Sequence, residues 1–539
     1  MQIQQKKIIW DGDDWLKGKA EQFETAVGNA GIMPGLTAMQ NVNPFYKLGS
    51  ITTSYKTIDI DDDEDLSEAQ KSGKVYREGF IATSFDGNLV RTDLTTSITV
   101  PQLDTGTTDG VTWPYGINSS SANCTGEDTA VYNSNVSSTS TNTFFFSWKD
   151  DTTGSETWNV GRYDGVNGTI DDDFMSTVPT GSGDFDDTNY ELPHPLEVGD
   201  DDVLYIGDGR YVHAYDGGQG TNGTFFEEVL TLPAGYVITA FGRVTDYLVV
   251  FAYKSNFVSG SNSYLQGTSK AFFWDYLNLD PTYIFDLNDN YVSEAVTFNS
   301  TVACFTRGRT NDLENPSRDC SLQLFTGSEF ESVADWIGDV PIRGGSFVRD
   351  RAIWWNSQDR FSNSVIYAWG QMFRNLDNKF YQLHLVSANT SASGCLAQPT
   401  TRYLYVAGGA INAGYVNPNQ FTSGFFTTQV AAPKFNNEHI GKAVSLKVNF
   451  AETTSTAVPD ITLQVYNQDG DSVTLLSNDP LQITDSNISA QYNIEDFGNL
   501  FFNGAYVAVT WSENATDTNA QVIQSIELEY EPININNLE

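Results

Sequence analysis

The side chains that most often carry catalysis or bind metal ions are sparse in this sequence. There are four histidines, His194, His213, His384 and His439, and no two of them stand at metal-ligand spacing. A zinc hydrolase motif such as HExxH needs two histidines one helical turn apart, because both must reach the same ion. The sequence also lacks a GxSxG elbow, a P-loop and a GxGxxG motif after a strand. We therefore predict that the protein is not an enzyme and has no catalytic, cofactor-binding or metal-binding residues.

One histidine and three tryptophans remain as candidates for binding or chemistry. His213 lies among tyrosines in an alternating stretch, which favours a structural imidazole over a general base. Trp354, Trp355 and Trp369 could stack on sugar rings, but aromatic side chains in repeated strands more often fill the space between sheets. We expect packing roles for all four residues.

Carboxylates are so abundant that no catalytic pair can be singled out. A glycoside hydrolase needs two carboxyl groups flanking the scissile bond, and their separation is not visible in a sequence. Four acidic segments could offer oxygen ligands to calcium: 59–68, 171–173, 200–202 and 286–290. None has the alternating spacing and central glycine of an EF-hand loop. We expect solvated acidic loops, with 286–290 the nearest to a metal loop.

The cysteines show no metal-binding or redox spacing. Cys124, Cys304, Cys320 and Cys395 are far apart and form no CxxC motif. Cys304 and Cys320 could face each other in neighbouring strands, but a buried free thiol, which packs as a small apolar side chain, is favoured.

The charge of the chain excludes several classes of partner. Asp and Glu number 69 against 29 Lys and Arg, which gives a formal net charge of −40. Nucleic acid and anionic lipid are bound by clustered Lys and Arg, so we expect no specific binding of DNA or RNA. No apolar run approaches the length of a membrane span, and Ile8-Ile9-Trp10 is too short for a signal-peptide core. We expect neither a membrane span nor a signal peptide.

The segment 200–217, DDDVLYIGDGRYVHAYDG, is the clearest structural unit in the sequence. Apolar and aromatic residues alternate with a period of two on both sides of the turn Gly207-Asp208-Gly209, as in a β-hairpin. Similar pairs of strand patterns, each ending in Gly or Asp, occur at 79–88, 144–165, 247–275, 302–327, 351–370 and 394–409. Later units recur every ~40–60 residues, the period of four-stranded propeller blades. The alternative is an all-β protein whose hairpins are not blades.

We predict an all-β fold built from an irregular β-propeller of about 6–8 blades and a C-terminal β-sandwich of jelly-roll type. The propeller is expected over 58–424, with a polar, low-complexity surface insertion at 101–142. Residues 1–57 are expected to form an N-terminal arm, with a short helix from Asp13 or Asp14 to about Gly28. Clean alternation in 444–450, 461–465, 507–511 and 526–530 predicts the sandwich over 425–539.

Two short patterns resemble β-propeller virion proteins of tailed bacteriophages, of the tail nozzle or tail hub class. The first is Asn43-Pro44-Phe45 followed by Leu48-Gly49 at the entry to the propeller. The second follows the last blade: Phe425-Phe426-Thr427-Thr428, an alternating strand, and the turn Asn467-Gln468-Asp469-Gly470. The chain is shorter than the nozzle proteins that it resembles.

The resemblance implies a structural virion protein of the phage tail, assembled in the host cytoplasm. It would form a symmetric ring with copies of itself around the DNA exit channel and contact other tail or adaptor proteins. DNA would pass without specific binding, because carboxylates facing a lumen repel phosphates. The alternatives are a receptor- or glycan-binding tail fibre or tip that recognises a host surface glycan, a capsid-decoration protein, and a polysaccharide-degrading propeller enzyme.

Overall fold

The computed structural model describes most of the chain, with gaps. The described residues are 6–11, 36–43, 50–60, 70–76, 79–84, 86–93, 102–104, 106–108, 110–117, 123–133, 142–152, 156–164, 168–177, 192–217, 223–255, 267–287, 291–307, 319–349, 351–359, 362–371, 378–387, 394–397, 404–408, 411–433, 435, 439–452, 461–475, 489–492, 500–511 and 522–537. The expected N-terminal helix and most of the acidic segment 59–68 lie outside these residues.

The described chain is almost entirely β-strand, as the sequence predicts. Helical structure within it is limited to α2 (Phe174–Thr177) and the short 3-10 helix η3 (Ile535–Asn537). The chain divides into two compact units: unit 1 comprises Met1–Thr57, Tyr367–Leu385 and Asn417–Glu539, and unit 2 comprises Ile58–Ile366 and Val386–Val416. Four strands continue along the chain from one unit into the other: β5 (Tyr55–Asp59), β31 (Ser364–Gly370), β32 (Lys379–Ser387) and β35 (Ile411–Phe421).

Unit 2 consists mostly of small antiparallel sheets that follow one another along the chain, and its strands between residues 291 and 359 join in one larger sheet. The strands of its first three sheets are β6 (Gln70–Tyr76), β7 (Gly79–Ser84), β8 (Asn88–Asp93), β9 (Gln102–Leu103) and β12 (Tyr115–Gly116); β13 (Cys124–Asn133), β14 (Asn142–Asp150), β15 (Thr157–Asp164) and β16 (Thr169–Asp171); β17 (Leu196–Val198), β18 (Leu204–Asp208), β19 (Tyr211–Asp216) and β20 (Thr224–Thr231). A separate hairpin joins β10 (Thr107–Thr108) to β11 (Val111–Thr112).

The later strands of unit 2 continue the series. They are β21 (Tyr236–Val244), β22 (Tyr247–Ser255), β23 (Gly267–Trp274) and β24 (Tyr283–Asp286); β25 (Tyr291–Phe298), β26 (Thr301–Arg307), β27 (Asp319–Phe325) and β28 (Phe330–Asp339); β29 (Ser346–Arg349) and β30 (Ala352–Asp359); β33 (Leu396–Ala397) and β34 (Leu404–Gly408).

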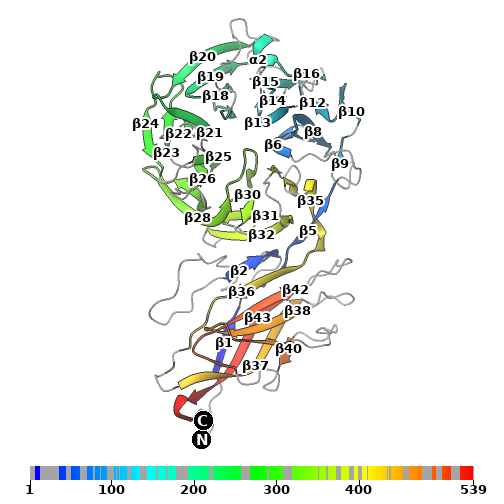
Figure 1. Ribbon diagram of the computed structural model, residues 1–539, viewed down its shortest axis with the longest axis vertical. Coiled ribbons are helices and arrows are strands. Elements are labelled where there is room, and N and C mark those ends of the chain that lie inside the picture. The colour runs from blue at the N-terminus through cyan, green and yellow to red at the C-terminus, as the bar shows by residue number, and fades with distance from the viewer. Residues whose placement is uncertain are drawn as a thin grey trace. The chain divides into compact units, whose positions relative to one another are not determined.

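The first strands of these sheets contact one another in a closed series. β6 contacts β13, and the contacts continue through β17, β21, β25, β29 and β33, which returns to β6. In Figure 1 the labelled first strands β6, β13, β21 and β25 lie toward the middle of the ring, and last strands such as β20, β24 and β28 lie at its rim. Small antiparallel sheets arranged in this way form a β-propeller.

The hairpins expected from the sequence supply the central strands of most sheets. The hairpin at 200–217 is β18 and β19, in which Leu204 pairs with Tyr215 and Asp208 with Tyr211. The units at 79–88, 144–165, 247–275 and 302–327 are the antiparallel pairs β7–β8, β14–β15, β22–β23 and β26–β27. Alternation with a period of two identified these strands correctly, because successive side chains of a strand point to opposite faces of its sheet.

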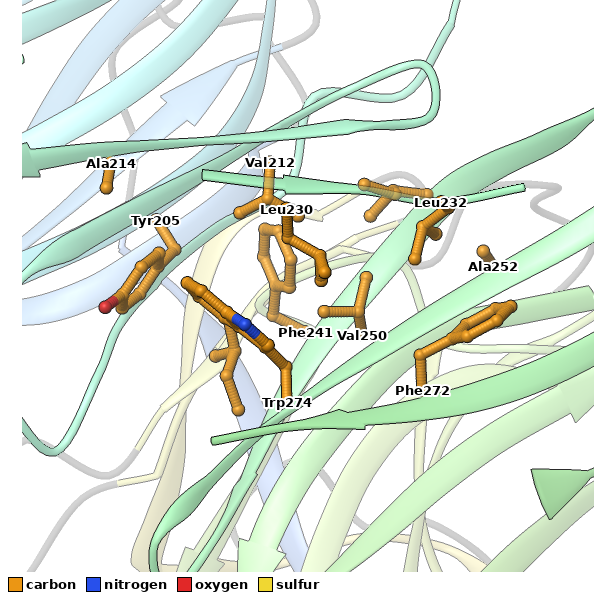
Figure 2. Close-up of a cluster of buried hydrophobic side chains, with 12 residues drawn as sticks. Tyr205, Val212, Ala214, Leu230, Leu232, Phe241, Val250, Ala252, Phe272 and Trp274 are labelled. Atoms are coloured by element: carbon orange, nitrogen blue, oxygen red, sulfur yellow. The ribbon is translucent and has the colours of Figure 1, made fainter. Parts of the chain in front are cut away.

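The apolar cores of the propeller lie between consecutive sheets. Figure 2 shows one of them, in which Tyr205, Val212 and Leu230 of one sheet pack against Phe241, Val250 and other side chains of the next. Burial of each such large apolar side chain contributes about 1.5–3 kcal/mol. A further cluster joins Phe80 and Ala82 of the first sheet to Cys395 and Tyr405 of the last.

The segment 101–142 differs from the surface insertion expected there. Its second half contains β13, whose Ala130 and Tyr132 are buried in the core with Phe145. Trp113 and Ile117 are buried as well. The polar composition was misleading because β13 is the first strand of its sheet, where polar side chains can be satisfied by neighbouring strands rather than by water.

Unit 1 contains two five-stranded antiparallel sheets. The first joins β1 (Lys6–Trp10), β43 (Val522–Asn534), β37 (His439–Glu452), β40 (Ser489–Tyr492) and β41 (Phe501–Phe502), and the second joins β2 (Leu36–Gln40), β36 (Gly424–Thr428), β42 (Ala505–Trp511), β38 (Ile461–Asn467) and β39 (Ser472–Leu475). A short pair links β3 (Val42–Asn43) to β4 (Thr52–Thr53). The segment expected as a separate arm thus supplies strands β1 and β2 to the same sheets as residues 424–534.

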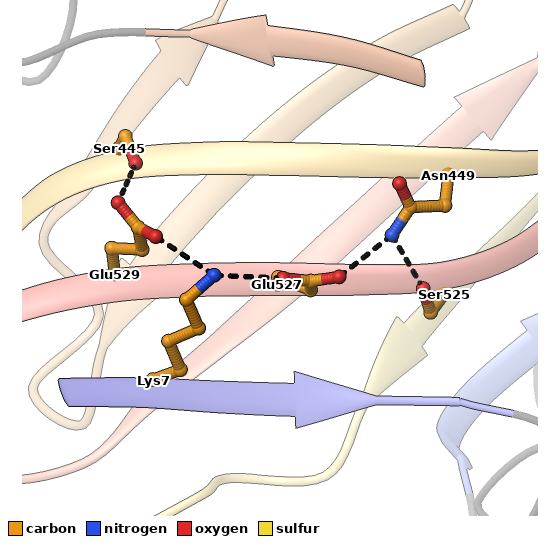
Figure 3. Close-up of polar contacts among 6 residues, drawn as sticks. All are labelled: Lys7, Ser445, Asn449, Ser525, Glu527 and Glu529. Atoms are coloured by element: carbon orange, nitrogen blue, oxygen red, sulfur yellow. Dashed lines mark hydrogen bonds and ion pairs between the residues drawn. The ribbon is translucent and has the colours of Figure 1, made fainter. Parts of the chain in front are cut away.

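Each sheet of unit 1 has one buried and one exposed face. Along β38, buried and partly exposed residues alternate from Ile461 to Asn467, and β42 behaves in the same way. On the exposed face of the first sheet, Lys7 of β1 pairs with Glu527 and Glu529 of β43 (Figure 3). The strict alternation is the pattern of a sheet that is covered on one side only.

Candidate functional site

The inner strands of the propeller carry β-bulges at polar residues. The register shifts between Gln70 and Gly73 in β6, between Gly126 and Thr129 in β13, between Ile238 and Ala240 in β21, and between Val292 and Glu294 in β25. The residues at these bulges are Lys71, Ser72, Glu127, Asp128, Thr239 and Ser293. A bulge changes the direction in which side chains point, and bulges are frequent next to functional sites. We therefore take this polar layer of the inner strands as the candidate site.

Asp128 is the best-satisfied carboxylate of the layer. Its Oδ1 accepts hydrogen bonds from Ser72 Oγ at 3.1 Å and from the backbone N of Thr129 at 2.8 Å. Its Oδ2 accepts one from the backbone N of Leu196 at 2.9 Å. These donors come from β6, β13 and β17, so the carboxylate ties three consecutive sheets together.

Glu127 forms a buried pair with His194. His194 Nδ1 lies 2.6 Å from Glu127 Oε2, and the imidazole ring stacks on Trp158 with ring centroids 3.7 Å apart. Burial alone would raise the pKa of Glu127, but the attraction of His194, Lys71 and Arg343 outweighs it and lowers the pKa to about 2. The carboxylate is therefore ionised and held in place rather than available for proton transfer near neutral pH.

A turn before β29 contacts several strands of this layer; we call residues 340–345 the axial strap. Arg343 Nε donates to the carbonyl of Thr239 in β21 at 3.2 Å, and the carbonyl of Gly344 accepts from Leu396 N in β33 at 3.0 Å. A Cβ on Gly344 would lie 2.8 Å from the backbone N of Gly73 in β6. Because β6, β21 and β33 belong to separate sheets, the strap connects inner strands from separate parts of the ring.

Glu294 of β25 faces the axial strap. Its Oε1 accepts a hydrogen bond from Gly344 N at 3.0 Å, and the side chain of Ser346 also interacts with the carboxyl group. Burial raises the pKa of Glu294 to about 8, although Lys74 acts in the opposite direction. A carboxyl group in this setting is protonated at neutral pH and can donate as well as accept.

The residues that the sequence raised as candidates lie elsewhere in packing roles. His213 accepts from Glu228 N through Nδ1 and stacks on Phe225. Trp355 is fully buried against Phe305 of the preceding sheet, and Trp369 is buried as well. All four cysteines are buried and free of disulfides, as expected. Among the residues that the structure describes, no group of three or more His, Cys, Asp or Glu could hold a metal ion.

The polar layer itself was missed by the sequence analysis. Lys71-Ser72, Glu127-Asp128 and Ser293-Glu294 are adjacent polar pairs inside strands that otherwise alternate. A break in alternation of this kind is the sequence signal of a bulge. It could have located the bulges, but not the strap that meets them.

Comparison with known proteins finds solved structures only, at low sequence identity and low TM-score. No family model matches the chain, and no curated protein matches it. Similar solved structures include the Cps50 (Swd1) β-propeller domain of Myceliophteria thermophila, at 9% identity and a TM-score of 0.38 over 67% of this chain and 97% of that chain. The Dos1 propeller is 10% identical with a TM-score of 0.38, over 68% of this chain and 94% of that chain.

An exo-β-1,3-galactanase from Phanerochaete chrysosporium is also similar, at 12% identity and a TM-score of 0.33 over 85% of this chain and 95% of that chain. Identities and TM-scores at this level transfer no activity or partner to this chain. Within the described part of the chain, no helix has the length and apolar character needed to cross a membrane.

Proposed function

We propose that this chain is a non-enzymatic structural protein of a tailed-bacteriophage virion, most consistent with a tail nozzle or hub. The resemblance at Asn43-Pro44-Phe45 and at 425–428 supports the virion assignment. In this role the protein forms a symmetric ring with copies of itself in the phage tail and contacts other tail or adaptor proteins.

The finer architecture belongs to the same proposal. We assign seven blades, each beginning with one of the strands β6, β13, β17, β21, β25, β29 and β33, whose mutual contacts support a closed ring. The two sheets of unit 1, each with a buried face, are assigned to a β-sandwich.

The observation that carries the structural role is the axial strap. Enzymes on propeller folds need an open pocket on the axis in which catalytic side chains converge on a substrate. Here the strap is bonded through Arg343 and Gly344 to three separate sheets of the inner layer. Asp128 and Glu127 are likewise engaged by neighbouring groups. Such an interior favours a rigid building block.

The net charge of −40 fits a ring through which DNA slides. Each phosphate neutralised by Lys or Arg would add affinity and friction, and carboxylates facing a lumen would remove that attraction. This part of the proposal requires that acidic side chains face the lumen of the ring.

Quantitative mass spectrometry of density-purified phage particles tests the role. A tail ring predicts a low fixed copy number, roughly six or twelve per particle. Hundreds of copies would instead assign the chain to capsid decoration, and a small number of copies lost with detachable fibres would assign it to a fibre or tip. Absence from particles would overturn the virion proposal.

A second candidate function, polysaccharide hydrolysis, is favoured by one observation. Glu294 is a buried carboxyl group with a pKa of about 8, which keeps it protonated at neutral pH as a general acid requires. The test is activity of the purified chain on a panel of acidic and neutral polysaccharides, with Glu294→Gln as the matched variant. Activity that disappears in the variant would support hydrolysis against the structural role.

A further inference from the structure

A rigid apolar projection stands on the propeller between β23 and β24; we call residues 275–282 the leucine knob. Leu277 and Leu279 are 88% and 80% exposed, more than any other large apolar side chain among the described residues. Tyr283 and Ile284 of β24 follow directly and are about half exposed. Contiguous exposed apolar side chains at this level mark interaction surfaces.

The leucine knob is held in one conformation by its own hydrogen bonds. Asp275 Oδ1 accepts from the backbone N of Leu277 at 3.1 Å and of Asn278 at 3.0 Å. Asn278 in turn accepts from Trp274 Nε1 through its carbonyl, at 2.5 Å. Tyr276, between them, packs inward against Tyr205 and Trp274. Because the backbone at Leu277 and Asn278 is held before binding, a partner does not have to order it.

Carboxylates surround the leucine knob. Asp280 lies within it, and Asp246 stands in the exposed turn before Tyr247, which lies beside Tyr283 of the adjoining β24. Asp200 is exposed and interacts electrostatically with Tyr276. The basic group near these residues, Arg243, is already paired with Glu197 and Asp200 at 3.0 and 3.3 Å. The surface therefore joins two exposed leucines to an acidic surround.

We propose that the leucine knob docks into an apolar pocket of a different protein, whose rim carries Lys and Arg. Charge complementarity selects this occupant, because a basic rim matches the carboxylates beside the leucines. The same surface of a second copy would bring its own carboxylates against those beside the leucines. The proposal deepens the virion role and rests on it: the partner is another protein of the same particle.

Carbodiimide cross-linking of purified particles tests the docking directly. The reagent joins a carboxylate to a lysine amine by an amide bond, and the carbodiimide takes up the oxygen that leaves the carboxylate. We expect Asp246, Asp275 or Asp280 to be linked to a lysine of a different virion protein. Within the chain, Asp286–Lys270 at 2.7 Å and Glu529–Lys7 at 2.9 Å are positive controls in the same digest.

The controls separate the possible failures. If the control links form and the three aspartates show no link to another protein, the docking proposal is overturned. Links from these aspartates to lysines of a second copy overturn it as well, because they assign the surface to self-association. If no peptide of the chain is found in particles, the virion role itself fails, which is a distinct result.

A variant pair sharpens the test with purified protein. The double variant Leu277→Ser/Leu279→Ser removes the exposed leucines, and Val348→Ser, at a position 37% exposed, is the matched control. We expect the double variant to bind the cross-linked virion protein at least ~10-fold more weakly, as for central apolar contacts, and the control to bind normally. Sedimentation should show the same oligomeric state for wild type and both variants. Unchanged binding, or a lost oligomer, would overturn the proposal.

Discussion

The two units of the molecule handle polar groups in opposite ways. In the propeller, ionisable side chains such as Glu127, Asp128 and Glu294 are buried on the bulged inner strands. In unit 1, charged side chains such as Lys7 and Glu527 lie on the exposed face of a sheet, over an apolar interior (Figure 3). A sheet covered on one side can leave its charges in water, whereas the first strand of a propeller sheet faces other strands.

This difference predicts where substitutions are costly. A buried ionised side chain costs little folding free energy as long as its partner is present. Removing the partner leaves an uncompensated charge. Exposed pairs are screened by water and contribute little. The stability of the propeller should therefore depend on pH and on single polar groups, and that of unit 1 on its apolar strands.

The largest effect is expected for His194→Gln. The substitution leaves the buried Glu127 carboxylate without its imidazole partner, which should lower the free energy of unfolding by about 3–5 kcal/mol. Chemical denaturation at pH 7 measures the change. The double variant Glu127→Gln/His194→Gln is the control. Its free energy of unfolding should fall less than that of His194→Gln, because position 127 then carries no charge. Equal losses for both variants would contradict a paired charge.

The same pair has a defined pH dependence. The pKa of Glu127 is lowered in the folded state to about 2, so its stabilising contribution is present above the unfolded pKa, about 4.5, and is lost as pH falls toward 2. Between pH 5 and pH 2, the free energy of unfolding of the propeller should therefore fall less in Glu127→Gln than in wild type.

A smaller loss is expected for Gly344→Ala in the axial strap. Gly344 has φ +72°, and an added Cβ would meet backbone and side-chain atoms of Ser72 and Gly73 at 2.8 Å. The expected cost is about 3 kcal/mol, from backbone strain and the displaced strap. Gly327→Ala is the matched control, since Gly327 has φ +101° with nothing within 4 Å of its Cβ, and should cost only about 1–2 kcal/mol. Similar losses of unfolding free energy in the two variants would show that Gly344 does not pack closely against Ser72 and Gly73.

An increase in stability is expected for Glu294→Gln at alkaline pH. The raised folded-state pKa of Glu294, about 8, means that its contribution is present at low pH and is lost as pH rises through about 8. The amide cannot ionise. The free energy of unfolding of the variant, relative to that of wild type, should therefore rise by on the order of 2 kcal/mol between pH 6 and pH 9. Chemical denaturation of both proteins at the two pH values measures this rise. The same difference in unfolding free energy at both pH values would rule out ionisation of this group.

The smallest effect is expected for Lys7→Ala in unit 1. The Lys7 side chain is 47% exposed and reaches Glu527 and Glu529 on the solvent face. Because exposed pairs contribute little, the denaturation midpoint should match that of wild type. Trp10→Ala on the same strand is the contrast, since Trp10 is 1% exposed and belongs to the apolar interior. A large loss for Lys7→Ala would remove the distinction between the two units.

Period-two alternation was enough to identify the all-β class and most of the hairpins of the propeller. The strands at 204–208 and 211–216 could be predicted because the side-chain period, the turn glycines and the stop residues are all local. The buried state of the four cysteines was predicted for a similar reason, because it follows from residue type.

Contacts between distant segments were decided by the tertiary structure alone. No local pattern shows that β1 pairs with β43, more than 500 positions later in the chain, as Lys7 and Glu529 do. Nor does any pattern bring Gly344 against Gly73, or His194 against Glu127. Composition and periodicity report how each strand meets its immediate surroundings, whereas the partners of a buried charge depend on which strands the closed ring brings together.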